Sequence, residues 1–260
     1  MDYLNKIEQN IFSDLHWNIP EQNQGIVSII GGNSQSFRSS IKVAEFLKEN
    51  YPIKKVNLVL PDALKSILPT VEDLEFLPST ESGSFGDDKS LMGTINSSDF
   101  NLILGDLSKN SITEKVIASA CENSAKPLII TRDTVDLIAN ADIEKILMNE
   151  NLIIFGSMAQ IQKVFRAAYY PRMILLSQSL VQVTETLHKF TLSFPVAIIT
   201  LHNNQIVIAK NGKVNVIPLE MSGYSPIMIW SGELAAKILA LNLYNPNNFL
   251  SATSAAILGK

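Results

Sequence analysis

The sequence predicts a three-layer α/β/α fold built on a mostly parallel sheet. Short apolar runs alternate with longer stretches whose apolar residues recur at helical spacing, and this alternation favours a parallel sheet with helices on both faces. After Phe194 the pattern changes to three short strands joined by tight turns. This change predicts antiparallel hairpin strands at one edge of the sheet.

The first predicted strand, GIVSIIGG (25–32), is apolar, uncharged and ended by glycines, as a buried strand requires. The following segment places Ile41, Ala44 and Leu47 on one helical face. The predicted elements that follow in order are strand 54–61, a Ser-, Gly- and Asp-rich loop over 78–90, strand 99–106, helix 111–124, and strands 126–131 and 151–157, each followed by a helical stretch.

The C-terminal part begins with PVAIITLHNNQIVIAKNGKVNVIPL (195–219). Asn211-Gly212 is a strong hairpin turn because both residue types accept positive φ at low cost, and Asn203-Asn204 is a weaker one. Two helices, over 232–243 and roughly 247–258, are expected to close the chain.

The bulk composition bounds the class of protein. The 260 residues are 46% hydrophobic and 18% charged, which is typical of a globular chain with a sizeable core. The loop 78–90 lies within the strand–helix alternation, so we expect a single domain over residues 1–260, with 1–24 as an N-terminal arm. The net charge of −4 and the lack of a Lys/Arg stripe argue against nucleic acid as a partner.

Cysteine and histidine usage argues against disulfides and metal centres. Cys121 is the only cysteine, so neither an intrachain disulfide nor a cysteine-based zinc site is expected. The histidines His16, His188 and His202 lack metal-ligand spacing. The polar N-terminus resembles neither a signal nor a transit peptide, and no apolar run reaches membrane-span length, so a cytoplasmic protein without a membrane partner is expected.

Two segments carry the candidate chemistry. In WSGELAAK, Ser231 can cap a helix whose first turn holds Gly232 and Glu233. The free N–H groups there form an anion site, and the Glu233 carboxylate beside it could take a proton from a hydroxyl. The plainer alternative is an acid that stabilises the helix dipole. After the first strand, GGNSQS (31–36) is either an anion- or ribose-binding turn or a glycine-assisted connection.

The order of these pieces resembles the ribokinase-like superfamily, and specifically its ATP/ADP-dependent NAD(P)H-hydrate dehydratase branch. The resemblance spans about residues 25–259 and rests on VSIIGGNS, VNLVLPDALKSILP, FNLILGDLSKN, PLIITRDTVDLIA, LIIFGSMAQIQKVF, the hairpin segment and WSGELAAKILAL. The last of these is similar to the family's G-[ST]-G-D-V-L-A-G-I motif, whose glycine turn forms an anion hole and whose acid is catalytic.

The resemblance implies a ribokinase-like fold and dehydration of hydrated NADH or NADPH driven by ATP or ADP, with or without Mg²⁺. It also implies homo-oligomers. It implies that Glu233 is the catalytic residue, that Ser231, Gly232 and His202 bind nucleotide phosphates, and that a crevice is formed by Gly32, Asn33, Gly105, Asp133 and Ser157. We expect the strand ends at Gly32, Gly105, Thr131, Gly156 and His202 to converge on that crevice.

Several chemical positions depart from the family pattern. Glu233 stands where the family has Asp, Trp230 replaces a small residue, and His202-Asn203 replaces Lys-Gly. Ser157 and Gln160 stand at a His and a Glu position. Two alternatives therefore stay open beside a divergent dehydratase: a catalytically silent homologue that binds a nucleotide or a partner, and a small-molecule kinase of the same superfamily.

Overall fold

A single sheet organises the computed structural model, which describes residues 2–7, 18–69 and 72–259. The strands are β1 (Leu4–Lys6), β2 (Gln24–Gly31), β3 (Ile53–Pro61), β4 (Leu74–Leu77), β5 (Phe100–Gly105), β6 (Leu128–Thr131), β7 (Leu152–Phe155), β8 (Ala197–His202), β9 (Gln205–Lys210) and β10 (Lys213–Pro218). The α-helices are α1 (Arg38–Asn50), α2 (Asp88–Ser97), α3 (Ser111–Asn123), α4 (Asp133–Ile138), α5 (Ile143–Leu147), α6 (Met158–Ala167), α7 (Leu180–Ser193), α8 (Leu219–Ser222), α9 (Glu233–Tyr244) and α10 (Phe249–Leu258). The remaining described elements are the 3₁₀ turns η2 (Asp62–Leu64) and η3 (Met228–Ser231).

The ten described strands lie in the order β1-β10-β9-β8-β7-β6-β5-β2-β3-β4. All neighbouring pairs are parallel except those that β9 makes with β8 and β10, which are antiparallel. The predicted fold class, a mostly parallel sheet with hairpin strands at one edge, is confirmed. Both hairpin turns are confirmed as well, because Asn203, Asn204, Asn211 and Gly212 all have positive φ.

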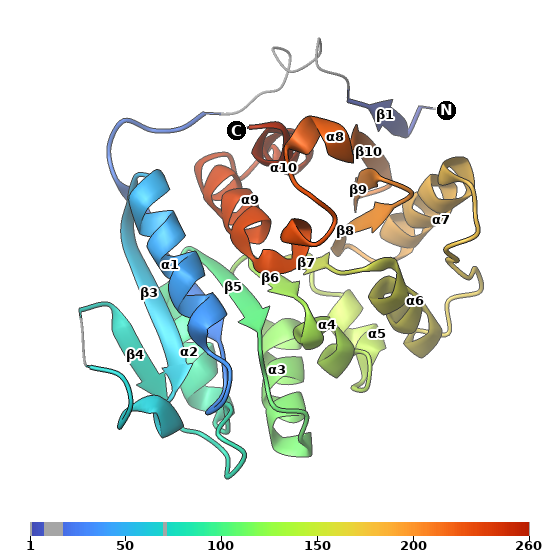
Figure 1. Cartoon of the computed structure of the whole chain (residues 1–260). Coiled ribbons are helices and arrows are strands. Elements are labelled where there is room, and N and C mark those ends of the chain that lie inside the picture. Colours follow the sequence, from blue (N-terminus) through green and yellow to red (C-terminus); the bar gives the residue numbers. More distant parts are fainter. Residues whose placement is uncertain (1, 8–17, 70–71, 260) are drawn as a thin grey trace.

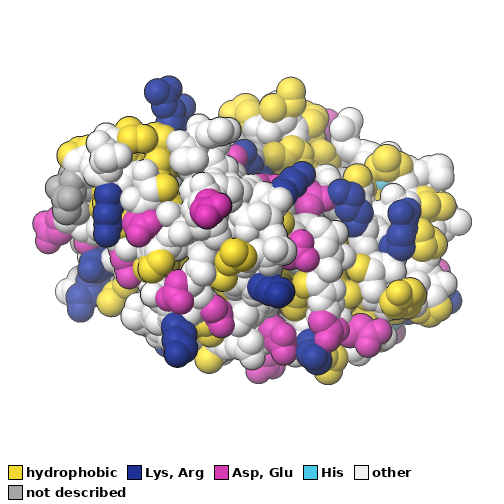
Figure 2. Space-filling view, turned by 90° about the horizontal axis from the view of Figure 1, so that it is seen from below, with side chains coloured by type: hydrophobic (Ala, Val, Ile, Leu, Met, Phe, Trp, Pro, Cys, Tyr) yellow, Lys and Arg dark blue, Asp and Glu magenta, His cyan; other side chains and the backbone are white. Residues whose placement is uncertain are grey.

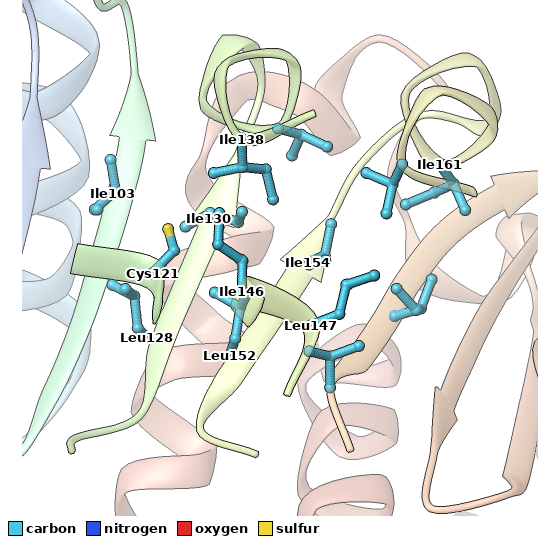
Figure 3. Close-up of a cluster of buried hydrophobic side chains, with 14 of the residues drawn as sticks. Ile103, Cys121, Leu128, Ile130, Ile138, Ile146, Leu147, Leu152, Ile154 and Ile161 are labelled. Carbon is cyan, nitrogen blue, oxygen red and sulfur yellow. The ribbon is translucent and has the colours of Figure 1, made fainter. Parts of the chain in front are cut away.

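Helices cover both faces of the sheet, as the buried central strands require. On one face α1, α8, α9 and α10 pack on the sheet, and Figure 1 shows α1 and α9 side by side there. On the other face α2 to α7 form a second apolar layer. Figure 3 shows part of that layer, in which Ile103, Ile130 and Ile154 of neighbouring strands meet Ile138 and Ile161 of helices.

The N-terminal segment expected as an arm over 1–24 is only partly described. Leu4–Lys6 forms β1, which pairs in parallel with β10, and Ile7 is 1% exposed within the core. His16 lies outside the described residues.

The loop expected over 78–90 is anchored to the body of the protein. Phe85 is buried in the core, and Thr113 Oγ1 donates a hydrogen bond to its carbonyl oxygen. Ser79 donates from its N–H and its hydroxyl to Asp62 Oδ1. Helix α2 begins at Asp88, inside the range expected as loop.

No helix in the described part of the chain combines the length and apolar character that a membrane span needs.

Candidate functional site

The parallel strands β2, β5, β6, β7 and β8 are consecutive neighbours in the sheet, so their carboxyl ends lie along one edge. Open α/β sheets bind ligands outside this edge. Figure 2 looks onto it and shows acidic and basic side chains interspersed. The edge therefore presents local pairs of charges and no broad field of one sign.

The ends of β2 and β5 are joined directly. Gly32 N–H donates to the Gly105 carbonyl at 2.9 Å, and Asn33 Nδ2 donates to the Asp106 carbonyl at 2.7 Å. Asn33 Oδ1 also accepts the N–H groups of Gln35 and Ser36, which closes the turn into α1. Asn33 is thus held by the backbone on both sides, and its amide serves the turn.

Asp133 fixes the loop that follows β5. Its carboxylate accepts the N–H groups of Asp106 and Leu107, both at 2.8 Å. A Cβ atom at Gly105, whose φ is +110°, would overlap Asp133 Oδ1, so this close approach requires glycine. Burial raises the pKa of Asp133, and the two N–H bonds oppose that rise without cancelling it.

Arg132 is a second feature of this loop, and it has a left-handed backbone with φ 56°. Its guanidinium pairs with both oxygens of Asp106, at 2.5 and 3.1 Å. Planar two-point pairing of this kind is among the stronger polar contacts between side chains. The guanidinium therefore lies at the ends of β5 and β6 with its charge already balanced.

Helix α6 begins with a capping box in which Ser157 Oγ accepts the Gln160 N–H and Gln160 Oε1 accepts the Ser157 N–H. Gln160 Nε2 donates onward to the Arg132 carbonyl and to Asp136 Oδ2. Lys163 pairs with the same Asp136 carboxylate. Burial acts to raise the pKa of Asp136, but the Lys163 and Gln160 contacts outweigh it and lower that pKa.

A pocket of about 370 Å³ opens among these side chains. Its lining is Arg132, Asp136, Ser157, Gln160, Lys163 and Trp230. The Trp230 ring lies 5.4 Å from the Phe155 ring, centroid to centroid. The pocket thus places two charged pairs beside one indole ring, and the cations of both pairs are already balanced by carboxylates.

The start of α9 is set by Gly232, which has φ +105°. A Cβ atom there would lie 2.5 Å from Leu104 Cδ1 and 2.8 Å from Val43 Cγ2, so glycine lets α9 pack closely over β5 and α1. The prediction that Ser231 caps this helix is wrong, because Gly232 is the N-cap and Ser231 ends η3. Ser231 Oγ still accepts the Glu233 N–H at 3.4 Å. The N–H groups of the first turn have no intrahelical partner, as at any helix start.

The Glu233 side chain is exposed at this helix start. Its charge acts on Lys237, which lies one turn further along the helix. Burial lowers the pKa of Lys237, and the Glu233 charge opposes that decrease. The Glu233 charge also acts on Tyr224, whose pKa is raised to about 12, mainly by burial and in addition by Glu233. No described cation lies within ion-pair distance of the Glu233 carboxylate.

His202 is 1% exposed at the end of β8. Its Nε2 lies 2.9 Å from the Gln178 carbonyl, and its Nδ1 has no hydrogen-bond partner. No hydrogen bond among the described residues links it to Ser231 or Gly232. A phosphate-binding role for His202 stays a prediction, and this burial does not favour it.

The structure therefore brings Gly32, Asn33, Gly105 and Asp133 together, and it connects Ser157 to them through Gln160 and Arg132. Sequence reasoning missed four charged groups of the edge, which are Asp106, Arg132, Asp136 and Lys163. A signal existed for two of them: Asp106 and Arg132 each stand directly after an apolar strand. Among the described residues, no group of three or more His, Cys, Asp or Glu side chains could hold a metal ion.

No protein-family model and no curated protein sequence matches the chain. Solved structures are similar to it in fold. A ribokinase-like superfamily protein from Enterococcus faecalis matches with a TM-score of 0.66 and 13% identity, over 99% of this chain and 86% of that one. The ADP/ATP-dependent NAD(P)H-hydrate dehydratase of Bacillus subtilis, crystallised with ATP and Mg²⁺ and soaked with CoA, matches with a TM-score of 0.60 and 12% identity, over 99% and 87%.

An ADP complex of Bacillus subtilis pyridoxal kinase is a further match, with a TM-score of 0.51 and 11% identity, over 91% of this chain and 89% of that one. The chain therefore has the ribokinase-like fold.

Proposed function

We propose that this protein binds ATP or ADP at the carboxyl edge of its sheet and dehydrates hydrated NADH or NADPH, with Glu233 as the base. One observation carries the proposal. Gly232, with its positive φ, leads into α9, whose first residue Glu233 has an exposed carboxylate that no described cation pairs with. The solved dehydratase of the same fold, crystallised with ATP and Mg²⁺, supports the choice of nucleotide and reaction.

In the proposed reaction the Glu233 carboxylate accepts the proton of the substrate hydroxyl. The substrate oxygen then forms a bond to the terminal phosphorus of the nucleotide, and the bond from that phosphorus to the nucleotide breaks. N–H groups at the start of α9 stabilise the charge on the transferred group. Phosphate then leaves with the carbon–oxygen bonding electrons, and the neighbouring carbon loses a proton to solvent water. The electrons of that carbon–hydrogen bond form the carbon–carbon double bond, which completes the dehydration.

A magnesium ion would accompany the nucleotide, because Mg²⁺ is usually held by substrate phosphates with one or two carboxylates. At this edge, Asp106 and Asp136 are the carboxylates that would hold the ion. Both are paired with cations of the same edge, so each would have to exchange a partner to contribute.

A catalytically silent homologue that binds a nucleotide or a partner is the second candidate, and specific contacts favour a site without catalysis. Arg132 and Lys163 are both neutralised by carboxylates, and His202 is buried. A site with its cations already paired binds phosphate less strongly than one with free cations. The expected homo-oligomer stays a prediction beside either candidate.

The test compares Glu233→Gln with Glu220→Gln. Glu220 is a matched control because it is also an exposed acid in the first turn of a helix, α8. With hydrated NADH and ATP or ADP, we expect Glu233→Gln to lower turnover by about 10²–10⁴-fold, the usual contribution of a general base, and Glu220→Gln to leave it unchanged. Nucleotide binding should be equal or tighter in Glu233→Gln, because a negative charge near the phosphates is removed.

Equal turnover by wild type and Glu233→Gln would remove Glu233 from the mechanism. Nucleotide binding by a wild type that turns over no hydrated dinucleotide would establish the silent homologue. Phosphorylation of another alcohol would establish a kinase.

A further inference from the structure

A cavity of about 440 Å³ lies at the opposite edge of the sheet from the candidate nucleotide site. It opens at the amino-terminal starts of β2, β5, β6 and β7 and beneath the C-terminal end of α9. Phe100 and Ile153 line it from the sheet, and Leu243, Pro246 and Phe249 line it from the helices. Small-molecule sites are typically cavities of this size with apolar walls and a few polar groups.

Asn242 supplies an unpartnered acceptor to this cavity. Its side chain is 4% exposed, and its Nδ2 donates to the Ile238 carbonyl at 2.8 Å and to Thr253 Oγ1 at 3.0 Å. These two bonds hold the amide in one orientation. Among the described residues, none donates a hydrogen bond to its Oδ1. Asn242 lines the cavity and so brings a fixed carbonyl oxygen to its wall.

Lys210 supplies a cation to the same cavity from the end of β9. Its Nζ lies 4.8 Å from the centroid of the Phe249 ring and 3.3 Å from the Glu150 carbonyl. No described carboxylate lies within ion-pair distance of it. Burial lowers the pKa of Lys210, and the Glu150 charge opposes this. A half-buried ammonium in this setting gains from an anionic ligand.

Among the described residues that line the cavity, the other charged one is Asp99, whose carboxylate accepts the Ile26 N–H at 2.9 Å. It precedes β5, whereas Lys210 ends β9, and the sheet order separates these two strands by four steps. At about 4.8 Å per step, the two strands lie roughly 19 Å apart. Asp99 and Lys210 therefore belong to different ends of the cavity. The acid whose charge acts on Lys210 is Glu150, and it forms no ion pair with the ammonium.

We propose that this cavity binds a small organic acid with a flat apolar body, its carboxylate on Lys210 and an N–H or O–H donor on Asn242 Oδ1. The apolar body lies against Phe249 and Leu243. The site is independent of the proposed nucleotide site, because the two lie at opposite edges of the sheet.

Indole-3-acetate is the probe, since it carries a flat apolar body, an N–H donor and a carboxylate. Indole-3-acetamide is the matched uncharged ligand. Titration calorimetry with the full chain should show saturable binding of the acetate, and at least roughly tenfold weaker binding of the amide. Lys210→Met should remove that preference, and Lys210→Arg should keep it.

Lys213→Met is the matched control variant. Lys213 lies on the same hairpin but lines only the adjoining groove at the start of α10, so its loss should leave the preference intact. The circular dichroism spectrum of each variant verifies its folding. The proposal is overturned by the absence of saturable binding at millimolar indole-3-acetate. It is equally overturned by equal affinity for the two ligands, by an unchanged preference in Lys210→Met, or by competition with ATP.

Discussion

Gly232 shows how one residue serves both packing and the proposed chemistry. Its φ of +105° lies in a region that residues with a Cβ rarely adopt, and the space where a Cβ would stand is taken by Leu104 and Val43. The same conformation turns the chain so that Glu233 begins α9 at the surface. Replacement of Gly232 therefore disturbs the fold before it disturbs any reaction.

We predict that Gly232→Ala destabilises the protein by about 1–3 kcal/mol, the usual cost of a strained backbone conformation. Gly93→Ala is the control, because Gly93 lies within α2 and nothing would lie within 4 Å of its Cβ. That change should stabilise the protein by about 0.5–1 kcal/mol through helix propensity. Denaturant unfolding measures both. Equal effects at the two positions would contradict the packing described for Gly232.

For single residues, the sequence predicted where site residues lie in the fold better than it predicted what their side chains do. Gly32, Gly105 and Asp133 could be placed at strand ends because apolar runs mark where buried strands stop. The role of Asp133 could not be predicted, because its partners, the N–H groups of Asp106 and Leu107, lie 27 and 26 residues away in the chain. The pairing of Arg132 with Asp106 is equally non-local.

At the scale of elements, α4 and α6 are joined by Asp136 of α4, which meets Gln160 and Lys163 of α6. The contact connects the two helices that follow β6 and β7 and so fixes one wall of the pocket. Sequence periodicity predicts that such helices exist, but it carries no information on which of their polar residues face one another.

We predict that this link stabilises the protein only above the acidic range. The pKa of Asp136 is lowered in the folded state, so its contribution is fully present above the unfolded value of about 3.9 and is lost as the pH falls through the folded pKa. Near neutral pH, Asp136→Asn should cost about 0.2–1 kcal/mol, since the pair is partly exposed. Urea unfolding at several pH values measures this difference.

Asp142→Asn is the matched control, because Asp142 and Lys145 form a pair whose side chains are 61% and 65% exposed. Its effect should be close to zero at every pH. If the loss of unfolding free energy in Asp136→Asn stayed constant into the acidic range, the charge of the Asp136 carboxylate would be excluded as the cause of that loss.

At the scale of the whole molecule, the continuous sheet explains why the fold could be predicted when much of the site could not. Central strands such as β5, β6 and β7 are buried along their full length, so their sequences are unbroken apolar runs. The edge strands β1 and β4 were not predicted. They are only three and four residues long and largely exposed or half-buried, so their sequences carry little apolar signal.

We predict that the chain unfolds as one cooperative domain. One sheet joins the first described strand to the hairpin near the C-terminus, since β1 pairs with β10, and no seam divides it. Calorimetry should give a single transition whose calorimetric and van't Hoff enthalpies agree. Two separated transitions, or two independently stable proteolytic fragments, would contradict this.

The central claim is that the carboxyl edge of the sheet binds an adenine nucleotide through its phosphates, whether or not chemistry follows. Its most direct test is the melting temperature with ATP, ADP or adenosine present. At a hundred times the dissociation constant, a nucleotide adds about 2.7 kcal/mol, which corresponds to a rise of roughly 5–10 °C for a chain of this size. We predict that rise with ATP or ADP and none with adenosine, whereas an unchanged melting temperature with both nucleotides would contradict the claim.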